Sequence, residues 1–136
     1  MPSSGHGKFS IWLSDNVIHS YVRGEWSADT ANRYSEAIHE AASKLPRKHW
    51  GHMVYLQQWR LGTPDIEPII TELVTWCLAN GLTKAAHVYH PDMLKDYQIN
   101  KMVISKQGEF EKREFAKESD AIAWLSSFAF NVEPAH

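Results

Sequence analysis

The stretch GHMVYLQQWRLGTPDIEPIITELVTWCLANG, residues 51–81, decides the fold. It begins with an apolar strand at Met53–Leu56 and continues through a short loop into a helix. Thr63 stands at the capping position of that helix, Pro64 at its tolerated first position, and Asn80-Gly81 at its end. The helix has one apolar face, formed by Ile66, Ile69, Ile70, Leu73, Val74 and Cys77. A strand followed by a loop and an amphipathic helix predicts an α/β architecture.

An antiparallel hairpin is predicted before this unit. Apolar and polar side chains alternate along Phe9–Ser14, which is the period-two pattern of a strand with one buried face. Asp15-Asn16 is a turn pair that accepts the positive φ angles of a tight hairpin, and Val17–Val22 then carries the chain back. The chain therefore opens with two paired strands.

The remaining elements complete an alternating pattern. A helix follows its cap at Ser27, a strand is expected at Lys84–Tyr89, and a helix opens at His90-Pro91-Asp92. Charges interleave with phenylalanines along Glu109–Phe115, which predicts a solvated edge strand, and a last helix covers Ala121–Phe128. We expect a mixed sheet of about five strands and about four helices.

Length and charge bound the class of protein. The 136 residues suit one domain, which we expect at residues 8–130 with flexible termini at 1–7 and 131–136. A net charge of −2 offers no broad positive field for nucleic acid. The N-terminus lacks the apolar centre of a signal peptide, and no run approaches the roughly 20 apolar residues of a membrane span. We expect a cytoplasmic protein that binds no nucleic acid and has no membrane span.

Several soft motifs occur in a characteristic order along the chain. They are Val17–Gly24 with Glu25-Trp26-Ser27, Trp50-Gly51, Trp76-Cys77 through Asn80-Gly81-Leu82, and Ala121-Ile122-Ala123-Trp124-Leu125. In this order and spacing the chain resembles the STAS domain, specifically the SpoIIAA-like family named after bacterial anti-sigma-factor antagonists. The resemblance implies a non-catalytic regulatory domain that binds a protein partner. It also implies control, in many members, by phosphorylation at the start of the helix after the third strand.

Thr63 is the candidate phosphosite that this resemblance implies. The classical antagonists carry Asp-Ser-Ser-Gly in the corresponding loop, whereas this chain has Trp59–Asp65 there, with Thr63 as the hydroxyl in the matching neighbourhood. A phosphate on Thr63 would be favoured by the free amides of the helix N-terminus and opposed by the negative charges of Asp65 and Glu67. The alternative interpretation is that Thr63 is a helix cap.

The carboxyl ends of the parallel strands form the predicted binding rim. Ligands of open α/β sheets bind in the crevice beyond these ends. We expect Trp59 to be exposed in its loop and to act as the apolar anchor for a protein partner, with Arg60 as a charged contact. The predicted partner-binding residues are Gln58, Trp59, Arg60, Thr63 and His90.

A carrier or sensor of a small apolar ligand or lipid, held in a pocket between sheet and helices, is the alternative function. Lipid-transfer proteins with a similar fold hold lipid between sheet and helices. A pocket of about a few hundred cubic ångströms, lined by Tyr97, Met102 and Phe110, would favour the carrier, whereas a filled core with an exposed Trp59 would favour the protein-binding module. A homodimer is a further interpretation, because surface tryptophan and an exposed strand are ordinary means of self-association.

Enzymatic, cofactor and metal chemistry are disfavoured. Cys77 lies on the apolar helix face, so we expect a buried and unreactive thiol. His49 and His52 lie near the start of the third strand and His90 beyond the end of the next, so these histidines with His87 cannot share one metal ion. A site of two histidines and a carboxylate stays open as an alternative. We predict no catalytic residue, no cofactor and no metal site.

Overall fold

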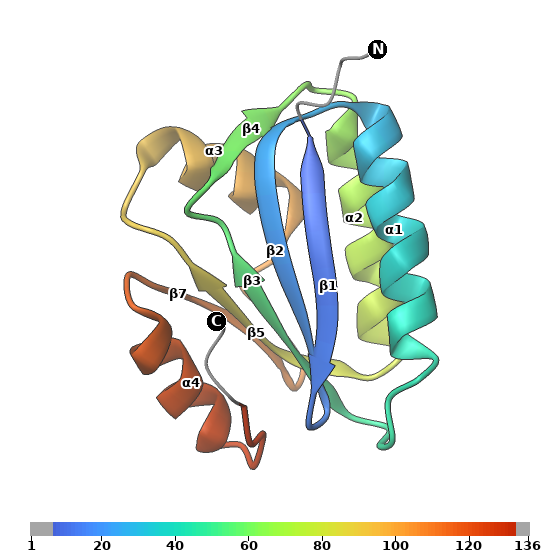
Figure 1. Cartoon of the computed structure of the whole chain (residues 1–136), viewed down its shortest axis with the longest axis vertical. Coiled ribbons are helices and arrows are strands. Elements are labelled where there is room, and N and C mark those ends of the chain that lie inside the picture. The colour runs from blue at the N-terminus through green and yellow to red at the C-terminus, as the bar shows by residue number, and fades with distance from the viewer. Residues whose placement is uncertain (1–6, 133–136) are drawn as a thin grey trace.

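The computed structural model describes residues 7–132, and in it one mixed sheet carries helices on both faces (Figure 1). The elements in chain order are β1 (Lys8–Ser14), β2 (Val17–Trp26), α1 (Ala28–Ala42), β3 (Trp50–Tyr55), β4 (Trp59–Gly62), α2 (Ile66–Ala79), β5 (Leu82–Val88), α3 (Met93–Met102), β6 (Lys106–Gln107), β7 (Phe110–Phe115) and α4 (Glu118–Ser126). The strand order is β1-β2-β3-β5-β7-β6, with β4 beside β2. The predicted mixed α/β fold is confirmed. The described residues form seven strands, however, where about five were expected.

The predicted hairpin and its turn are present. β1 and β2 pair antiparallel from Lys8 and Arg23 to Ser14 and Val17, and Asp15 in the turn has a φ of 52°. The buried Asn16 ties this turn to the loop before β3, because its amide nitrogen donates to the carbonyl of His49 at 2.6 Å. The hairpin therefore has a fixed position against the start of the third strand.

The helical crossover places β3 and β5 side by side. β3 is parallel to β2 and to β5, and β5 is parallel to β7. α2 provides the connection between β3 and β5 and covers the sheet beside α1 (Figure 1). This arrangement confirms the side-by-side parallel strands that the sequence predicted, and it brings their carboxyl ends to one end of the molecule.

The two faces of the sheet have separate cores. α1, α2 and α3 cover one face, where the largest buried side chains include Trp50 and Ile38. α4 covers the other face together with the chain at Phe130 and Val132. The N–H of Asn131 donates to Asp15, so Asn131 and Val132, which we expected in a flexible tail, pack onto the domain. The rest of the two expected flexible tails, 1–6 and 133–136, lies outside the described residues.

β4 is the element that the sequence pattern did not predict. Trp59 and Gly62 pair in parallel with Gly24 and Trp26 of β2. The N–H of Thr63 continues this ladder by donating to the carbonyl of Trp26. Thr63 therefore directly follows β4 and does not cap α2. The N-cap is Asp65, whose carboxylate accepts a hydrogen bond from the Thr63 hydroxyl.

Candidate functional site

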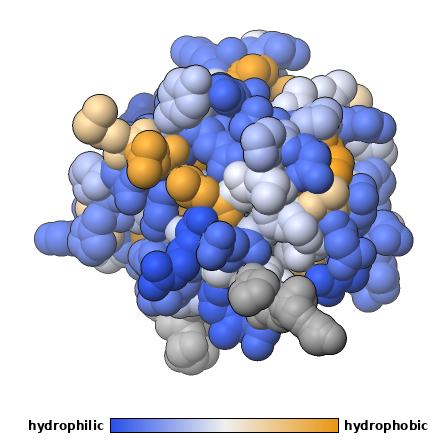
Figure 2. All heavy atoms as spheres, turned by 90° about the horizontal axis from the view of Figure 1, so that it is seen from above, coloured by the Kyte–Doolittle hydropathy of each residue, from blue (hydrophilic) through white to orange (hydrophobic). Residues whose placement is uncertain are grey.

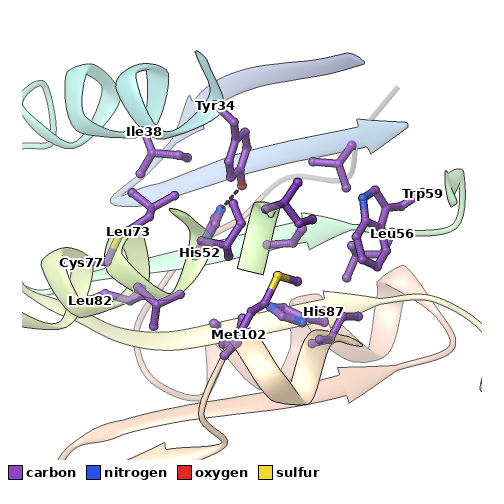
Figure 3. Close-up of a pocket in the computed structure, with 18 of the residues that line it drawn as sticks. Tyr34, Ile38, His52, Leu56, Trp59, Leu73, Cys77, Leu82, His87 and Met102 are labelled. Atoms are coloured by element: carbon purple, nitrogen blue, oxygen red, sulfur yellow. Dashed lines mark hydrogen bonds between the residues drawn. The ribbon is translucent and has the colours of Figure 1, made fainter. Parts of the chain in front are cut away.

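A cavity of about 100 Å³ lies between the sheet and the helices α1, α2 and α3 (Figure 3). Its wall is mostly aliphatic and aromatic, and it is formed by Val22, Trp26, Tyr34, Ile38, His52, Val54, Leu56, Trp59, Ile66, Ile70, Leu73, Val74, Cys77, Leu82, Ala85, His87, Ile99, Met102, Val103 and Phe110. An apolar cavity of about 150 Å³ engineered into another protein binds benzene. The volume here suits a single small ring, and it is below the few hundred cubic ångströms expected of a lipid carrier.

Strand alternation determines which residues reach the cavity. Successive side chains of a strand point to opposite faces, so Ala85 and His87 of β5 face the cavity, whereas Ala86 faces α4. The same rule places His52 of β3 on the cavity side and Met53 on the α4 side. Ala85 is the smallest side chain in the wall, so part of the open volume arises where a larger residue would fill the space.

Tyr34, Ser20 and His52 form a hydrogen-bonded chain at the wall. The Tyr34 hydroxyl donates to Ser20 Oγ at 2.8 Å, and Ser20 Oγ lies 2.9 Å from His52 Nε2. Because the Ser20 oxygen accepts from Tyr34, its own hydrogen is free for His52 Nε2, which makes Nε2 the acceptor and leaves the ring proton on Nδ1. Burial lowers the pKa of His52 to about 3 and raises the pKa of Tyr34, so both side chains are neutral at physiological pH.

His87 differs from His52 in having no such partner. Its side chain is 5% exposed, and its Nδ1 makes no hydrogen bond to any of the residues that the structure describes. Burial lowers its pKa well below the usual value, and the positive charge of Lys112 acts in the same direction. Lys112 is occupied elsewhere, because its ammonium donates to Asn100 Oδ1 at 2.9 Å and pairs with Glu114 at 3.3 Å. His87 is therefore a neutral, unpaired polar group in an apolar wall.

Cys77 also lines the cavity. It is buried, as its place on the apolar helix face predicted, and burial raises the pKa of its thiol to about 12. The thiolate is the nucleophilic form of cysteine. At neutral pH Cys77 is therefore a small apolar wall residue.

The predicted binding rim lies on the upper left of Figure 1, around β4 and the loops that follow β3 and β5. Gln58, Arg60, Thr63 and His90 are exposed there. Trp59 is only 4% exposed, so the expectation of an exposed indole anchor is wrong. The reason is β4, which pairs Trp59 with Gly24 and directs the indole into the cavity wall (Figure 3). The sequence carries a short signal for this, because Trp59, Arg60 and Leu61 alternate as apolar, polar and apolar residues, as in a strand with one buried face.

Two of the three predicted pocket residues line the cavity. Met102 and Phe110 line the cavity, but Tyr97 is 65% exposed and does not. The start of α3 sets this orientation: Asp92 caps the helix by accepting from the N–H groups of Leu94 and Lys95, and the Lys95 ammonium donates to the carbonyl of Leu56 at 2.9 Å. Ile99 and Met102 then turn inward and Tyr97 turns outward.

The outer surface of the predicted binding rim contains both polar and apolar side chains. A shallow depression of about 370 Å³ is lined by Gln57, Gln58, Trp59, Arg60, Leu61, Asp92, Leu94 and Lys95. Beside it, Met93, Leu94 and Tyr97 are large apolar side chains that the domain leaves exposed. Figure 2, which views the molecule from above, shows hydrophobic surface interrupted by hydrophilic surface.

The histidines of residues 7–132 do not gather as a metal site. The cavity brings His52 together with His87, whereas His49 precedes β3 and the exposed His90 follows β5. Within residues 7–132, no group of three or more histidine, cysteine, aspartate or glutamate side chains is arranged to hold a metal ion. In the same part of the chain, no helix combines the length and apolar character that crossing a membrane requires.

The fold belongs to the SpoIIAA-like class, as comparison with solved structures shows. The chain is similar to an uncharacterized protein of the DUF3478 family with a SpoIIAA-like fold from Shewanella loihica PV-4, with a TM-score of 0.66 over 92% of this chain and 98% of that chain. The two sequences are 13% identical, so the likeness concerns the fold alone. No family model matches the chain, and no curated protein matches it.

Proposed function

We propose that this domain binds a small apolar ligand in the cavity between the sheet and α1, α2 and α3, and that it does so without catalysing a reaction. This is the small-ligand form of the alternative function, in a cavity that is smaller than expected and that Met102 and Phe110 line without Tyr97. The observation that carries it is the open volume itself. Protein interiors contain few voids larger than a water molecule.

The cavity has a cost that supports this proposal. At about 24 cal/mol per Å³, a void of about 100 Å³ lowers the free energy of unfolding by roughly 2 kcal/mol. That is a considerable part of the roughly 5–15 kcal/mol that stabilises a typical domain. A ligand that fills the void would recover dispersion contacts with the wall. We therefore expect the ligand-bound form to be the more stable one.

Thermal unfolding in the presence of toluene tests this function. A ligand at about ten times its Kd stabilises the folded state by about 1.4 kcal/mol, so toluene is expected to raise the Tm of the wild type by several degrees. Ala85→Leu fills the cavity and should abolish the increase. Ala123→Leu adds the same volume at an exposed position of α4 and should leave the increase intact. An unchanged Tm of the wild type, or an equal increase in Ala85→Leu, would contradict the proposal.

A protein-binding role at the rim is the second candidate, because Met93, Leu94 and Tyr97 expose apolar surface beside Arg60. With Trp59 buried, Leu94 at 67% exposure replaces it as the apolar anchor of this proposal. Affinity capture tests the role by comparing the wild type with Arg60→Ala and Leu94→Ser. Phe128→Ser, at another exposed apolar residue, is the control. Partners that both rim variants retain would exclude the rim.

A further inference from the structure

His87 is the side chain of the cavity wall with a buried ring nitrogen that has no partner among the described residues. A buried polar atom without a hydrogen bond is unfavourable, and the great majority of such atoms in proteins are paired. His52, also in the wall, uses its Nε2 in the bond to Ser20. The two histidines thus differ: His52 is held by the protein, and His87 is available to a molecule in the cavity.

His87 lies on the side of the cavity that the sheet forms. His87 of β5 is the register partner of Val54 in β3, and Ala85 is the partner of His52. Both rings thus lie on the sheet side, opposite the aliphatic side chains of α2 and α3 (Figure 3). A ligand that hydrogen-bonds to His87 would place its apolar part against Ile70, Leu73 and Met102.

The charges near the cavity restrict the ligand. None of the wall residues is an aspartate, glutamate, lysine or arginine. Lys112, the charged neighbour of His87, is satisfied by Asn100 and Glu114. A carboxylate or an ammonium group in the cavity would therefore be buried without an opposite charge, which is strongly unfavourable.

We propose that His87 is the recognition residue of this cavity and that its ligand is a small apolar molecule with one uncharged hydroxyl group, such as a phenol. This inference rests on the proposed function and names its ligand class. The hydroxyl donates to the unprotonated nitrogen of the His87 ring, or accepts from the protonated one, because a neutral imidazole offers one of each. The ring of the ligand fills the apolar part of the cavity.

His19 provides a matched control. It is also buried, and neither of its ring nitrogens has a partner among residues 7–132. Its ring stacks on Trp12 at a centroid distance of 5.0 Å, on the face of the sheet that α4 covers. His19 does not line the cavity, so the exchange of His19 for leucine should affect stability without affecting ligand choice.

The experiment compares the Kd values of toluene, p-cresol and 4-methylbenzoate at pH 7.5 by calorimetry or NMR titration. These probes share one methylated ring and differ in having no polar group, a hydroxyl or a carboxylate. For the wild type we expect p-cresol to bind about tenfold more tightly than toluene, and 4-methylbenzoate to bind more weakly than either. In His87→Leu the Kd values of p-cresol and toluene should become about equal, with toluene binding retained. His19→Leu should keep the tighter binding of p-cresol.

The outcomes separate this inference from the proposed function. Equal Kd values of toluene and p-cresol in the wild type would overturn the hydroxyl preference and leave the cavity as an apolar site. A preference for p-cresol that survives in His87→Leu, or 4-methylbenzoate as the tightest probe, would also overturn it. If none of the three probes binds, the proposed function fails and the inference fails with it. If His87→Leu does not fold, the ¹⁵N shifts of the wild-type His87 ring decide, because p-cresol should move them and toluene should not.

Discussion

The two faces of the sheet solve the packing problem differently. On the face covered by α4, rings fill the space: Tyr55 stacks with Trp12 and with Tyr21, each at a centroid distance of 5.9 Å, and its hydroxyl donates to Glu118 at 2.6 Å. On the face covered by α1, α2 and α3, aliphatic and aromatic side chains surround an open volume. Because neighbouring residues of one strand serve both faces, this difference depends on single positions such as Ala85 and Ala86.

The histidines of β2, β3 and β5 illustrate the same difference. His19 on the α4 face packs flat between aromatic rings, whereas His52 and His87 on the other face border the cavity. An imidazole within an aromatic stack is a packing element. An imidazole at the edge of an open apolar volume can select a ligand. Strand parity, and not residue type alone, decides whether a histidine of this sheet packs in an aromatic stack or borders the cavity.

Acid should destabilise both faces, with the largest effect among these predictions. Burial lowers the pKa of His19 to about 4 and of His52 to about 3, so between pH 6.5 and these values the unfolded chain binds protons that the folded chain does not. The free energy of unfolding therefore has its full value above about pH 6.5 and decreases as the pH falls below it. From pH 7 to pH 4 we expect a loss on the order of 3 kcal/mol from His52 alone.

Urea unfolding at several pH values measures this effect. His19→Leu and His52→Leu should each reduce the dependence of the free energy of unfolding on pH between 4 and 6.5. A pH dependence that both variants leave unchanged would show that neither histidine is buried in its neutral form.

Truncation of apolar side chains should distinguish the filled face from the open one. Leu125→Ala removes a fully buried side chain of α4 that packs against the sheet. We expect the free energy of unfolding to fall by an amount near the upper end of about 2–5 kcal/mol. Ile70 borders the existing cavity and has fewer atoms around it, so Ile70→Ala should cost nearer the lower end. Chemical denaturation gives both values. A larger loss in Ile70→Ala would mean that its side of the core is the better packed.

Enlargement of the neighbouring alanines Ala85 and Ala86 should change the free energy of unfolding by different amounts. Ala86→Val adds two methyl groups to the filled face and should cost about 1–3 kcal/mol, because overpacking forces neighbours out of position. Ala85→Val adds them to the cavity, where they find space, and should change the free energy of unfolding by less than about 1 kcal/mol. Equal destabilisation by the two variants would indicate that the cavity does not stay open in solution.

The sequence predicted the elements that have strong periodicity. The hairpin with its Asp15-Asn16 turn, the apolar face of α2 and the buried Cys77 all follow from local patterns and are present in the structure. Trp59 was misplaced because a strand of four residues is too short for its alternation to be conspicuous. Its pairing with β2, on which the burial depends, is a contact between distant parts of the chain.

The cavity was harder to predict than the fold. α3 has a weak apolar pattern, so its phase is set by the Asp92 cap and by the Lys95 contact with Leu56, and these turn Tyr97 outward. The placement of His52 and His87 on one wall depends on the register of β3 against β5, which pairs His52 with Ala85 and Val54 with His87. A register cannot be derived from either strand alone. An open volume is the result of packing three helices on a sheet, and no local sequence pattern reports it.

An NMR measurement of where toluene binds to the wild-type protein tests most directly whether the cavity is a ligand site. Intermolecular nuclear Overhauser effects should connect the ring protons of toluene with the methyl groups of Ile70, Leu73 and Met102 in the cavity wall. No such effects should reach the methyl groups of Met53 and Leu125 on the α4 face. Effects to Met53 and Leu125, or none to the cavity wall at saturating toluene, would contradict the assignment of this cavity as the ligand site.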